Sequence, residues 1–328
     1  MGGRRVRFGV IGTGLMGRLH AENLAFRIDG AELAAVCDIE TAAAEACAER
    51  CEIDAAYEDY RRLLSHPLDA VVVCTPPERH GAIIEDAAAA GMDIFCEKPL
   101  DSDLTMIGRA CEAVTRAGVK LQVGFNRRFD RRFRQAREAV ARGQIGTPLT
   151  LQIISRDPVR AEGEQGTFAP EMFLDTTIHD FDMARFIMNA EIISVCAFGV
   201  GGDDEDAGRS PRTAVTVLRL ANGAVGTIEN SWLSAYGYDQ RLEVFGPVGA
   251  VRVENEEASS SVGETPAPFF VRRYSDSYLA EMEAFTECVL EDREPVVSGG
   301  DGRAAVVLAL AAERSYHQGR PVAVSEIG

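Results

Sequence analysis

Three short segments of the chain carry residue types that together suit the oxidation of an alcohol. Gly12-Thr13-Gly14-Leu15-Met16-Gly17 has the glycine spacing of a loop that cradles a dinucleotide. Glu97-Lys98-Pro99 supplies a cation, and Asp175 and His179 lie four residues apart, about one helical turn. A cofactor cradle, a cation and a base beside a carboxylate are the parts that hydride transfer from an alcohol requires.

The glycine-rich segment stands in the context that this motif needs. It follows an apolar run over residues 6–11 and opens a helical pattern. Gly12 allows a tight bend, Gly14 lets a pyrophosphate approach the backbone, and Gly17 allows close packing of helix on strand. The helix N-terminus then faces the phosphates. We expect the whole segment to bind the cofactor, that is Gly12, Thr13, Gly14, Leu15, Met16 and Gly17.

Asp38 indicates which dinucleotide is bound. It ends the next apolar run, 21 residues after Gly17, where a carboxylate accepts hydrogen bonds from the adenosine ribose. A carboxylate at this place repels a 2′-phosphate, and the following Ile39-Glu40 supplies no cation to neutralise one. The sequence therefore predicts NAD rather than NADP as the cofactor.

Two further segments follow apolar runs and are expected at the same edge of a sheet. Thr75-Pro76-Pro77 follows the run 70–74, and Glu97-Lys98-Pro99 follows the run 93–96. In open α/β sheets, ligands bind outside the carboxyl ends of the strands. We expect Thr75, Pro76 and Glu97 to line the cofactor crevice and Lys98 to reach the nicotinamide end. The alternative for Lys98 is an exposed lysine in water.

Asp175 and His179 complete the candidate chemistry. A histidine has a pKa suited to taking the hydroxyl proton, and a carboxylate can fix its tautomer. Lys98 would stabilise the developing alkoxide, so no metal is required. The alternative, if residues 176–188 form a helix, is that Asp175 is its N-cap and His179 a hydrogen-bonded core residue.

The elements that must position these residues fall into two patterns. Residues 1–124 alternate alanine-rich helical stretches with runs that are almost wholly apolar, at 6–11, 32–37, 70–74, 93–96 and 120–123. Such runs are typical of a parallel sheet covered on both faces. The sequence therefore predicts an α/β fold that begins with a doubly wound Rossmann domain over residues 1–124.

Residues 125–328 are predicted to form an α+β domain with a mainly antiparallel sheet. The runs 213–220 and 224–229 flank Asn222-Gly223, a strong hairpin signal. An apolar stripe predicts a helix with Phe129, Phe133, Ala136 and Val140 on one face. Further strands are expected at 240–245 and 250–254, helices at 278–290 and 302–317, and loops at 203–208 and 256–268.

Charge and composition exclude several classes of partner. The chain has 328 residues and a formal net charge of −17, which disfavours nucleic acid and anionic membranes as partners. Its apolar runs are too short for a membrane span or a signal peptide. Six arginines between Arg127 and Arg137 form the densest basic patch, either a solvated helix face or, at Arg127 above all, an anion site.

The cysteines point to a cellular compartment. The chain has 8 cysteines, scattered without a Cys-x-x-Cys pair. Scattered cysteines in a chain of this length are typical of buried, reduced thiols. We therefore expect a cytoplasmic protein.

The chain resembles the Gfo/Idh/MocA oxidoreductase family over essentially its whole length, and within it the inositol 2-dehydrogenases. Glu97-Lys98-Pro99 marks the family broadly. Further landmarks of the resemblance are Thr75-Pro76-Pro77 with His80 and Tyr236-Gly237-Tyr238-Asp239-Gln240-Arg241. The strings more specific to the inositol branch are Arg128-Phe129-Asp130, Ser155-Arg156-Asp157-Pro158 and His179-Asp180-Phe181-Asp182-Met183-Ala184-Arg185.

The resemblance implies an activity and a set of site residues. It implies NAD-dependent oxidation of a cyclic polyol, myo-inositol first, to 2-keto-myo-inositol, with Lys98, Asp175 and His179 as the catalytic trio. It also implies an open-faced second sheet that pairs subunits into dimers or tetramers, and a place for His80 at the cofactor. Residues implied to line the polyol pocket are Arg127, Asp157, Thr176 and Tyr236.

Two departures from the family's pattern leave the substrate open. Residues 167–173 differ from the usual approach to the catalytic aspartate, and Trp232-Leu233 stand where related enzymes often carry arginines. Trp232 could stack on a sugar ring or serve the core or an interface. The alternatives are therefore another inositol isomer, a pyranose or a glycoside as substrate, or a non-catalytic NAD-binding regulator.

Overall fold

The computed structural model describes residues 4–158, 171–201, 210–255 and 270–328. Within these residues the chain divides into two compact units. The first comprises Met1–Asn126 and Asp276–Arg303, and the second Arg127–Ser275 and Ala304–Gly328. The expected loops at 203–208 and 256–268, and the departure at 167–170, lie outside the described residues.

The first unit contains the predicted parallel sheet. Its strand order is β3-β2-β1-β4-β5-β6, with every neighbouring pair parallel. This is the strand order of a dinucleotide-binding doubly wound fold. The strands are β1 (Val6–Ile11), β2 (Ala31–Cys37), β3 (Ala56–Tyr57), β4 (Ala70–Val73), β5 (Asp93–Cys96) and β6 (Leu121–Val123). The prediction of a Rossmann domain is confirmed.

Helices connect these strands as the alternating pattern indicated. They are α1 (Leu15–Phe26), α2 (Thr41–Arg50), α3 (Tyr60–Leu63), α4 (His80–Ala89) and α5 (Leu104–Ala117). The sequence analysis did not predict β3 or α3, because a two-residue strand and a single helical turn leave no periodicity to detect.

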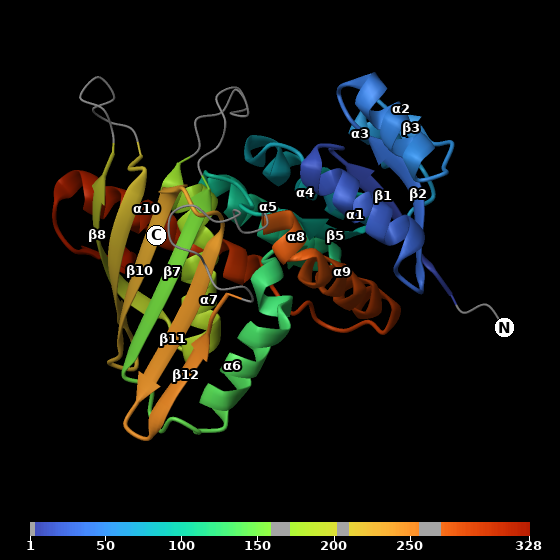
Figure 1. Cartoon of the computed structure of the whole chain (residues 1–328). Coiled ribbons are helices and arrows are strands. Elements are labelled where there is room, and N and C mark those ends of the chain that lie inside the picture. Colours follow the sequence, from blue (N-terminus) through green and yellow to red (C-terminus); the bar gives the residue numbers. More distant parts are fainter. Residues whose placement is uncertain (1–3, 159–170, 202–209, 256–269) are drawn as a thin grey trace. The chain divides into compact units, whose positions relative to one another are not determined.

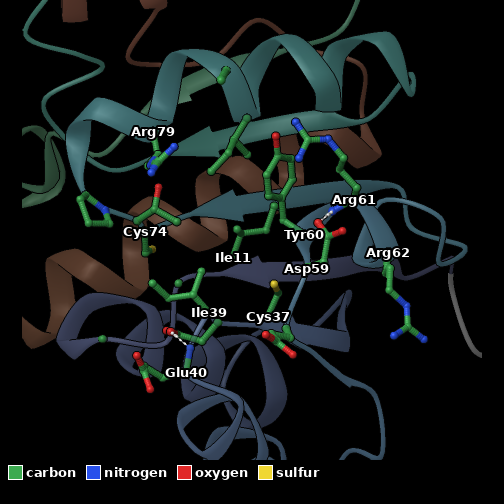
Figure 2. A pocket seen from close by; sticks show the side chains of 18 of the residues that line it. Ile11, Cys37, Ile39, Glu40, Asp59, Tyr60, Arg61, Arg62, Cys74 and Arg79 are labelled. Carbon is green, nitrogen blue, oxygen red and sulfur yellow. Dashed lines mark hydrogen bonds between the residues drawn. The ribbon is translucent and has the colours of Figure 1, made fainter.

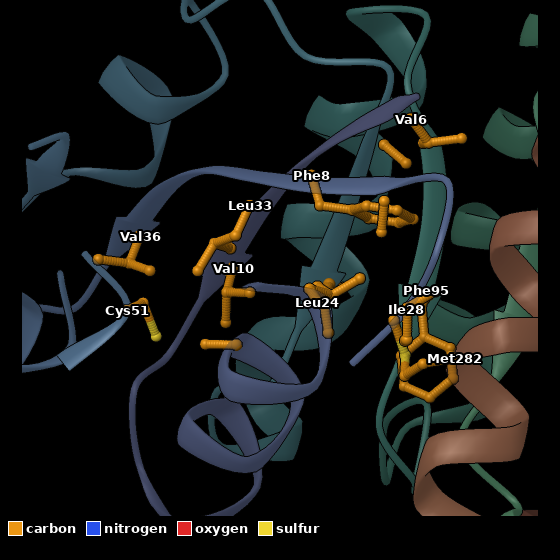
Figure 3. Close-up of a cluster of buried hydrophobic side chains, with 14 of the residues drawn as sticks. Val6, Phe8, Val10, Leu24, Ile28, Leu33, Val36, Cys51, Phe95 and Met282 are labelled. Carbon is orange, nitrogen blue, oxygen red and sulfur yellow. The ribbon is translucent and has the colours of Figure 1, made fainter. Parts of the chain in front are cut away.

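The C-terminal part of the chain contributes to the first unit, which the boundary expected at residue 124 did not include. Helix α9 (Ser275–Leu290) buries Met282 and Phe285 in the apolar cluster that holds Phe8 and Phe95 (Figure 3). The ring centroids of Phe285 and Phe95 are 5.9 Å apart. Because burying each of these side chains stabilises the fold by about 1.5–3 kcal/mol, α9 is part of the Rossmann core.

The second unit is built on a seven-stranded mixed sheet, whose strands β7 to β12 are coloured green to orange in Figure 1. Its order is β12-β11-β7-β10-β9-β8-β13, antiparallel except between β7 and β10. The strands are β7 (Thr150–Pro158), β8 (Ile192–Val200), β9 (Thr213–Leu220), β10 (Val225–Ser234), β11 (Asp239–Gly246), β12 (Gly249–Val253) and β13 (Val322–Ala323). The mainly antiparallel sheet is thus confirmed.

Helices cover one face of this sheet. Helices α6 (Arg131–Ala141) and α7 (Ile178–Met188) lie against it (Figure 1), and a short α8 (Phe270–Arg273) follows later. Residues of β9 alternate between buried and exposed, so one face of the sheet is covered and the other is not. The long α10 (Gly299–Gln318) ends in this unit, where the Ser315 hydroxyl accepts a hydrogen bond from the Ala197 amide.

No helix in the described ranges is long and apolar enough to cross a membrane.

Candidate active site

The glycine-rich turn between β1 and α1 is shaped to leave room for a ligand. Gly12 has φ +90°, and a Cβ there would lie 2.6 Å from the Cys74 carbonyl oxygen. A Cβ on Gly17 would lie 1.8 Å from the Gly12 oxygen, so only glycine lets α1 start this close to β1. A Cβ on Gly14, by contrast, would meet nothing within 4 Å. The turn therefore presents a bare backbone at a helix N-terminus, which fits a pyrophosphate.

Asp38 is fixed beside this turn. Its Oδ2 accepts hydrogen bonds from the Thr13 amide at 2.7 Å and the Thr13 hydroxyl at 3.0 Å. Its Oδ1 accepts a third from the Glu40 amide at 3.0 Å. Charge-assisted bonds of this kind hold a carboxylate in one orientation, at the end of β2 where a ribose would bind.

A cavity of about 1180 Å³ opens over the carboxyl ends of β1, β2 and β4 (Figure 2). Of the residues predicted to bind cofactor, its walls include Gly12, Gly14, Asp38, Thr75 and Pro76. A volume of this order suits a ligand of cofactor size. The residues present therefore fit a dinucleotide.

The same cavity holds cations that the sequence analysis did not anticipate. Arg61 and Arg62 of α3 and Arg79 after Pro77 line it, although Ile39-Glu40 supplies none. Arg61 pairs with Asp86 at 3.3 Å. Arg61 and Arg62 were missed because α3 was not predicted, and Arg79 because the 3₁₀ turn Pro77–Arg79 was not predicted.

His80 joins the two loops that follow β4 and β5. Its Nδ1 lies 2.8 Å from the Pro99 carbonyl oxygen and its Nε2 2.7 Å from the Thr75 carbonyl oxygen. Burial lowers the pKa of His80, while both carbonyl contacts act in the opposite direction. The imidazole is only 1% exposed, so it ties Thr75-Pro76 to the loop of Lys98.

Lys98 is anchored at the end of β5 by its neighbour Glu97. The Lys98 amide donates to Glu97 Oε2 at 3.2 Å, and the other oxygen of Glu97 lies 2.8 Å from His20 Nε2. His20 is fully buried, and its ring packs against Phe95 at 5.2 Å between centroids. Nothing in the sequence analysis identified His20. An ionisable residue on the buried face of α1 was the available signal.

Asp175 and His179 lie on either side of an irregular helix start in the second unit. The expected helix over 176–188 begins as α7 at Ile178, preceded by a π-helical turn, η3 (Phe173–Thr177). Asp175 therefore lies inside the turn rather than at an N-cap, and its amide donates to the Glu171 carbonyl at 2.8 Å. Such π turns occur frequently at functional sites.

A buried polar network supports this turn from the sheet. Asp180 is fully buried and accepts hydrogen bonds from Arg127 at 2.5 Å and Asn230 at 2.7 Å. Burial raises the pKa of Asp180, and the Arg127 charge opposes that shift. The anion at Arg127 in this structure is thus a carboxylate of the chain. Arg128, which the sequence analysis placed on a solvated face, is likewise buried and paired with Asp182.

The other residues implied to bind polyol fall into two places. The Thr176 hydroxyl lies 3.4 Å from Asp157 Oδ2. Tyr236 instead donates to Asp239 at 2.9 Å and contacts Arg156. Successive residues of a strand point to opposite faces, so Arg156 and Asp157 on β7 direct these two groups apart. Lys98 belongs to the first unit, and the remaining catalytic candidates belong to the second.

The fold and these residues define an NAD-binding oxidoreductase. Residues 6–125 match the family described as "Oxidoreductase family, NAD-binding Rossmann fold" (GFO_IDH_MocA). Residues 133–252 match the GFO/IDH/MocA C-terminal domain. The chain belongs to the Gfo/Idh/MocA family and is an NAD-dependent dehydrogenase.

Similar proteins cover nearly the whole chain. A "Myo-inositol 2-dehydrogenase" of Thermotoga maritima is 41% identical, over 98% of this chain and 99% of its own. An "Inositol 2-dehydrogenase" of Rhizobium meliloti is 40% identical over 98% and 99%. The structure of a scyllo-inositol dehydrogenase from Lactobacillus casei with bound NAD(H) and scyllo-inositol has a TM-score of 0.91 at 26% identity, covering 98% of this chain and 100% of that one.

Proposed function

We propose that the protein oxidises myo-inositol at C2 to 2-keto-myo-inositol. The observation that carries this proposal is the 41% identity to a myo-inositol 2-dehydrogenase over nearly the full length of both chains. Within it, residues 1–124 bind NAD and residues 125–328 bind the polyol, with α9 added to the first unit's core. The bare glycine turn and the fixed Asp38 carboxylate support NAD binding.

The chain's residues divide the reaction between them. His179 takes the proton of the substrate hydroxyl, and Asp175 orients the imidazole. Lys98 stabilises the negative charge that develops on the oxygen. NAD, when bound, would supply the acceptor for the hydride. The C–H and O–H bonds break, a C=O bond forms, and the proton leaves His179 for solvent. Both Asp175 and His179 are half-buried, so they remain accessible to a small substrate.

The residues that hold cofactor and substrate are assigned by the same reasoning. The segment 12–17, Asp38, Thr75 and Pro76 contact the dinucleotide, and His80 with Glu97 fixes the loops around it. Residues proposed to receive the polyol hydroxyls are Lys98, Arg127, Asp157, Asp175, Thr176, His179 and Tyr236.

A second substrate has a specific observation in its favour. The Lactobacillus casei structure with similar fold holds scyllo-inositol, an isomer that differs at one carbon. A pyranose or a glycoside would use the same groups. A catalytically silent NAD-binding regulator would need none of Lys98, Asp175 and His179, and the presence of all three favours an enzyme.

We also propose a cytoplasmic homotetramer. All eight cysteines are free thiols, and five of them are buried, which fits a reducing compartment. The sheet of the second unit exposes apolar side chains, including Phe198 at 59% and Val217 at 41%, which a partner subunit would cover.

The experiment is NADH formation at 340 nm with myo-inositol, scyllo-inositol, chiro-inositol, glucose and a methyl glucoside, with NADP in parallel. Turnover of myo-inositol with NAD supports the proposal. Activity only on another inositol or a sugar moves the substrate and keeps the mechanism. Silence on every compound, with NAD still bound, contradicts the proposal and favours the regulator.

A further inference from the structure

Trp232 is the only tryptophan of the chain and lies on β10 beside the catalytic turn. Its indole Nε1 donates a 2.8 Å hydrogen bond to the Thr176 hydroxyl oxygen. Two residues earlier on the same strand, Asn230 Oδ1 accepts a 2.8 Å hydrogen bond from the Thr177 hydroxyl. Strand β10 thus holds two consecutive residues of the π turn η3, and the next residue toward the N-terminus is Asp175.

The hydrogen bond from Trp232 has only one possible direction. An indole N–H is a donor and never an acceptor, so the Thr176 oxygen accepts it. The single proton of the Thr176 hydroxyl then points to its other partner, Asp157 Oδ2, at 3.4 Å. The result is a directed chain of contacts from Trp232 through Thr176 to the Asp157 carboxylate.

The surroundings make this chain effective. Thr176 is 6% exposed, so water competes little for its hydroxyl. The Trp232 amide donates to the Arg212 carbonyl at 2.9 Å, which fixes the backbone that carries the indole. A rigid donor at the start of the chain therefore determines which way the hydroxyl proton points at its end.

We propose that Trp232 is a positioning residue that sets the affinity and isomer preference for the polyol, acting through Thr176 on Asp157. This inference rests on the proposed function, which gives Thr176 and Asp157 to the substrate. A polyol hydroxyl donates to a carboxylate oxygen, and a site built for such bonds discriminates strongly against a hydroxyl in the wrong place. With the Thr176 proton fixed, Asp157 presents one defined arrangement to the ring hydroxyls.

The test compares Trp232→Phe, Thr176→Val and the double variant. Trp232→Phe keeps a ring and removes the N–H, so we expect KM for myo-inositol to rise about 3–10-fold, as one net hydrogen bond implies. We expect kcat to change less than about threefold, since the reacting groups stay in place, and KM for NAD to stay unchanged. The ratio of kcat/KM for myo- and scyllo-inositol should shift. Val248→Ala, 74% exposed in the turn between β11 and β12, is the control with wild-type kinetics.

The double variant separates a specific contact from a general loss of packing. If Trp232 acts through Thr176, the effects of the two substitutions on KM are not additive, and the double variant resembles Thr176→Val alone. Additive effects, or a Trp232→Phe enzyme with wild-type KM and isomer ratio, overturn the inference.

A substrate-free measurement separates failure of this inference from failure of the proposed function. The urea midpoints of the same four proteins give the Trp232–Thr176 coupling without any polyol. Coupling in urea together with no turnover of any polyol by the wild-type protein means that the proposed function is wrong, and the role of Trp232 in substrate affinity falls with it. Turnover without coupling overturns only the inference.

Discussion

Lys98 follows the last residues of β5, where the backbone is held by hydrogen bonds on both sides. The Glu97 amide donates to Val73 on β4, and the Lys98 amide donates to the Glu97 carboxylate. The Lys98 side chain is half-buried, so its ammonium is less screened than one fully exposed to water. We propose that this ammonium stabilises the negative charge that develops on the substrate oxygen in the transition state.

Lys98→Ala should therefore abolish most turnover and spare cofactor binding. Loss of one group that stabilises an oxyanion costs about 10²–10³-fold in kcat. Turnover is measured at 340 nm and NAD affinity by calorimetry, with Lys120→Ala as a control, because Lys120 pairs with Asp292. A variant that loses NAD binding and retains kcat would contradict the assigned role.

We propose that Asp38 decides between the two dinucleotides, although arginines share its cavity. In Asp38→Ser the ribose loses a charged acceptor, and hydrogen bonds to charged groups contribute about 1.5–3 kcal/mol, so KM for NAD should rise roughly tenfold or more. The repulsion of a 2′-phosphate also disappears while Arg61, Arg62 and Arg79 remain. NADP turnover should therefore rise. Equal NAD and NADP kinetics in the wild type would show that Asp38 does not discriminate.

The single residues that sequence reasoning identified are those whose neighbours lie close in the chain. Gly12 and Gly17 were recognised from the glycine spacing after one apolar run, and Asp38 from its place at the end of the next run. The hydrogen-bond partners of Glu97 and Asp180 could not be predicted from such local patterns. His20 meets Glu97 across 77 positions, and Asn230 meets Asp180 across 50. Such pairs are fixed by packing, which local sequence patterns do not encode.

At the level of elements, α9 carries an acid into the core of the first unit. Glu281 is fully buried on the same helix face as Met282 and Phe285. One of its carboxyl oxygens lies within 4.8 Å of a ring nitrogen of His20 and of a carboxylate oxygen of Glu97. Burial and then the charge of Glu97 raise the pKa of Glu281 well above its ordinary value.

The raised pKa of Glu281 predicts that the free energy of unfolding falls as the pH rises. A carboxyl group whose pKa is raised on folding binds its proton more tightly in the folded chain, so stability is lost as pH rises from about 4.3 through the folded value. Glu281→Gln cannot ionise and should gain stability relative to wild type between pH 5 and pH 8, read from urea midpoints. The control is Glu283→Gln, exposed on the same helix. A variant less stable at pH 8 than at pH 5, relative to wild type, would mean that Glu281 is ionised.

The start of α7 shows where periodicity fails as a guide. The sequence analysis considered a regular helix over residues 176–188, whereas the structure has a π turn before Ile178. The Thr177 hydroxyl donates to Asn230 Oδ1 of β10 at 2.8 Å, and its oxygen lies 3.2 Å from the Met172 carbonyl oxygen, five residues back. The irregular turn is therefore stabilised by a contact with a distant strand, and no pattern within residues 171–188 contains that information.

At the scale of the whole molecule, the sequence predicted the two types of sheet, but it did not predict how all of their strands pair. Continuous apolar runs predicted the parallel sheet, and Asn222-Gly223 predicted the β9–β10 hairpin, which forms with Gly223 at φ +86°. The parallel pairing of β7 with β10 was not predicted, since both strands alternate like antiparallel ones. Their register depends on residues 75 positions apart, such as Gly226 and Leu151.

The proposed tetramer follows from the uncovered face of the second sheet and can be tested there. Phe198 on β8 and Val215 on β9 are direct neighbours and are 59% and 41% exposed. Burying apolar area stabilises an interface by about 25 cal/mol per Å², whereas burying a charge without a partner is strongly unfavourable. Val215→Asp should therefore dissociate the assembly, which light scattering after gel filtration measures. Val248→Asp, 74% exposed in the β11–β12 turn, is the matched control and should keep the wild-type mass. If Val215→Asp keeps that mass as well, this face is not where the subunits meet.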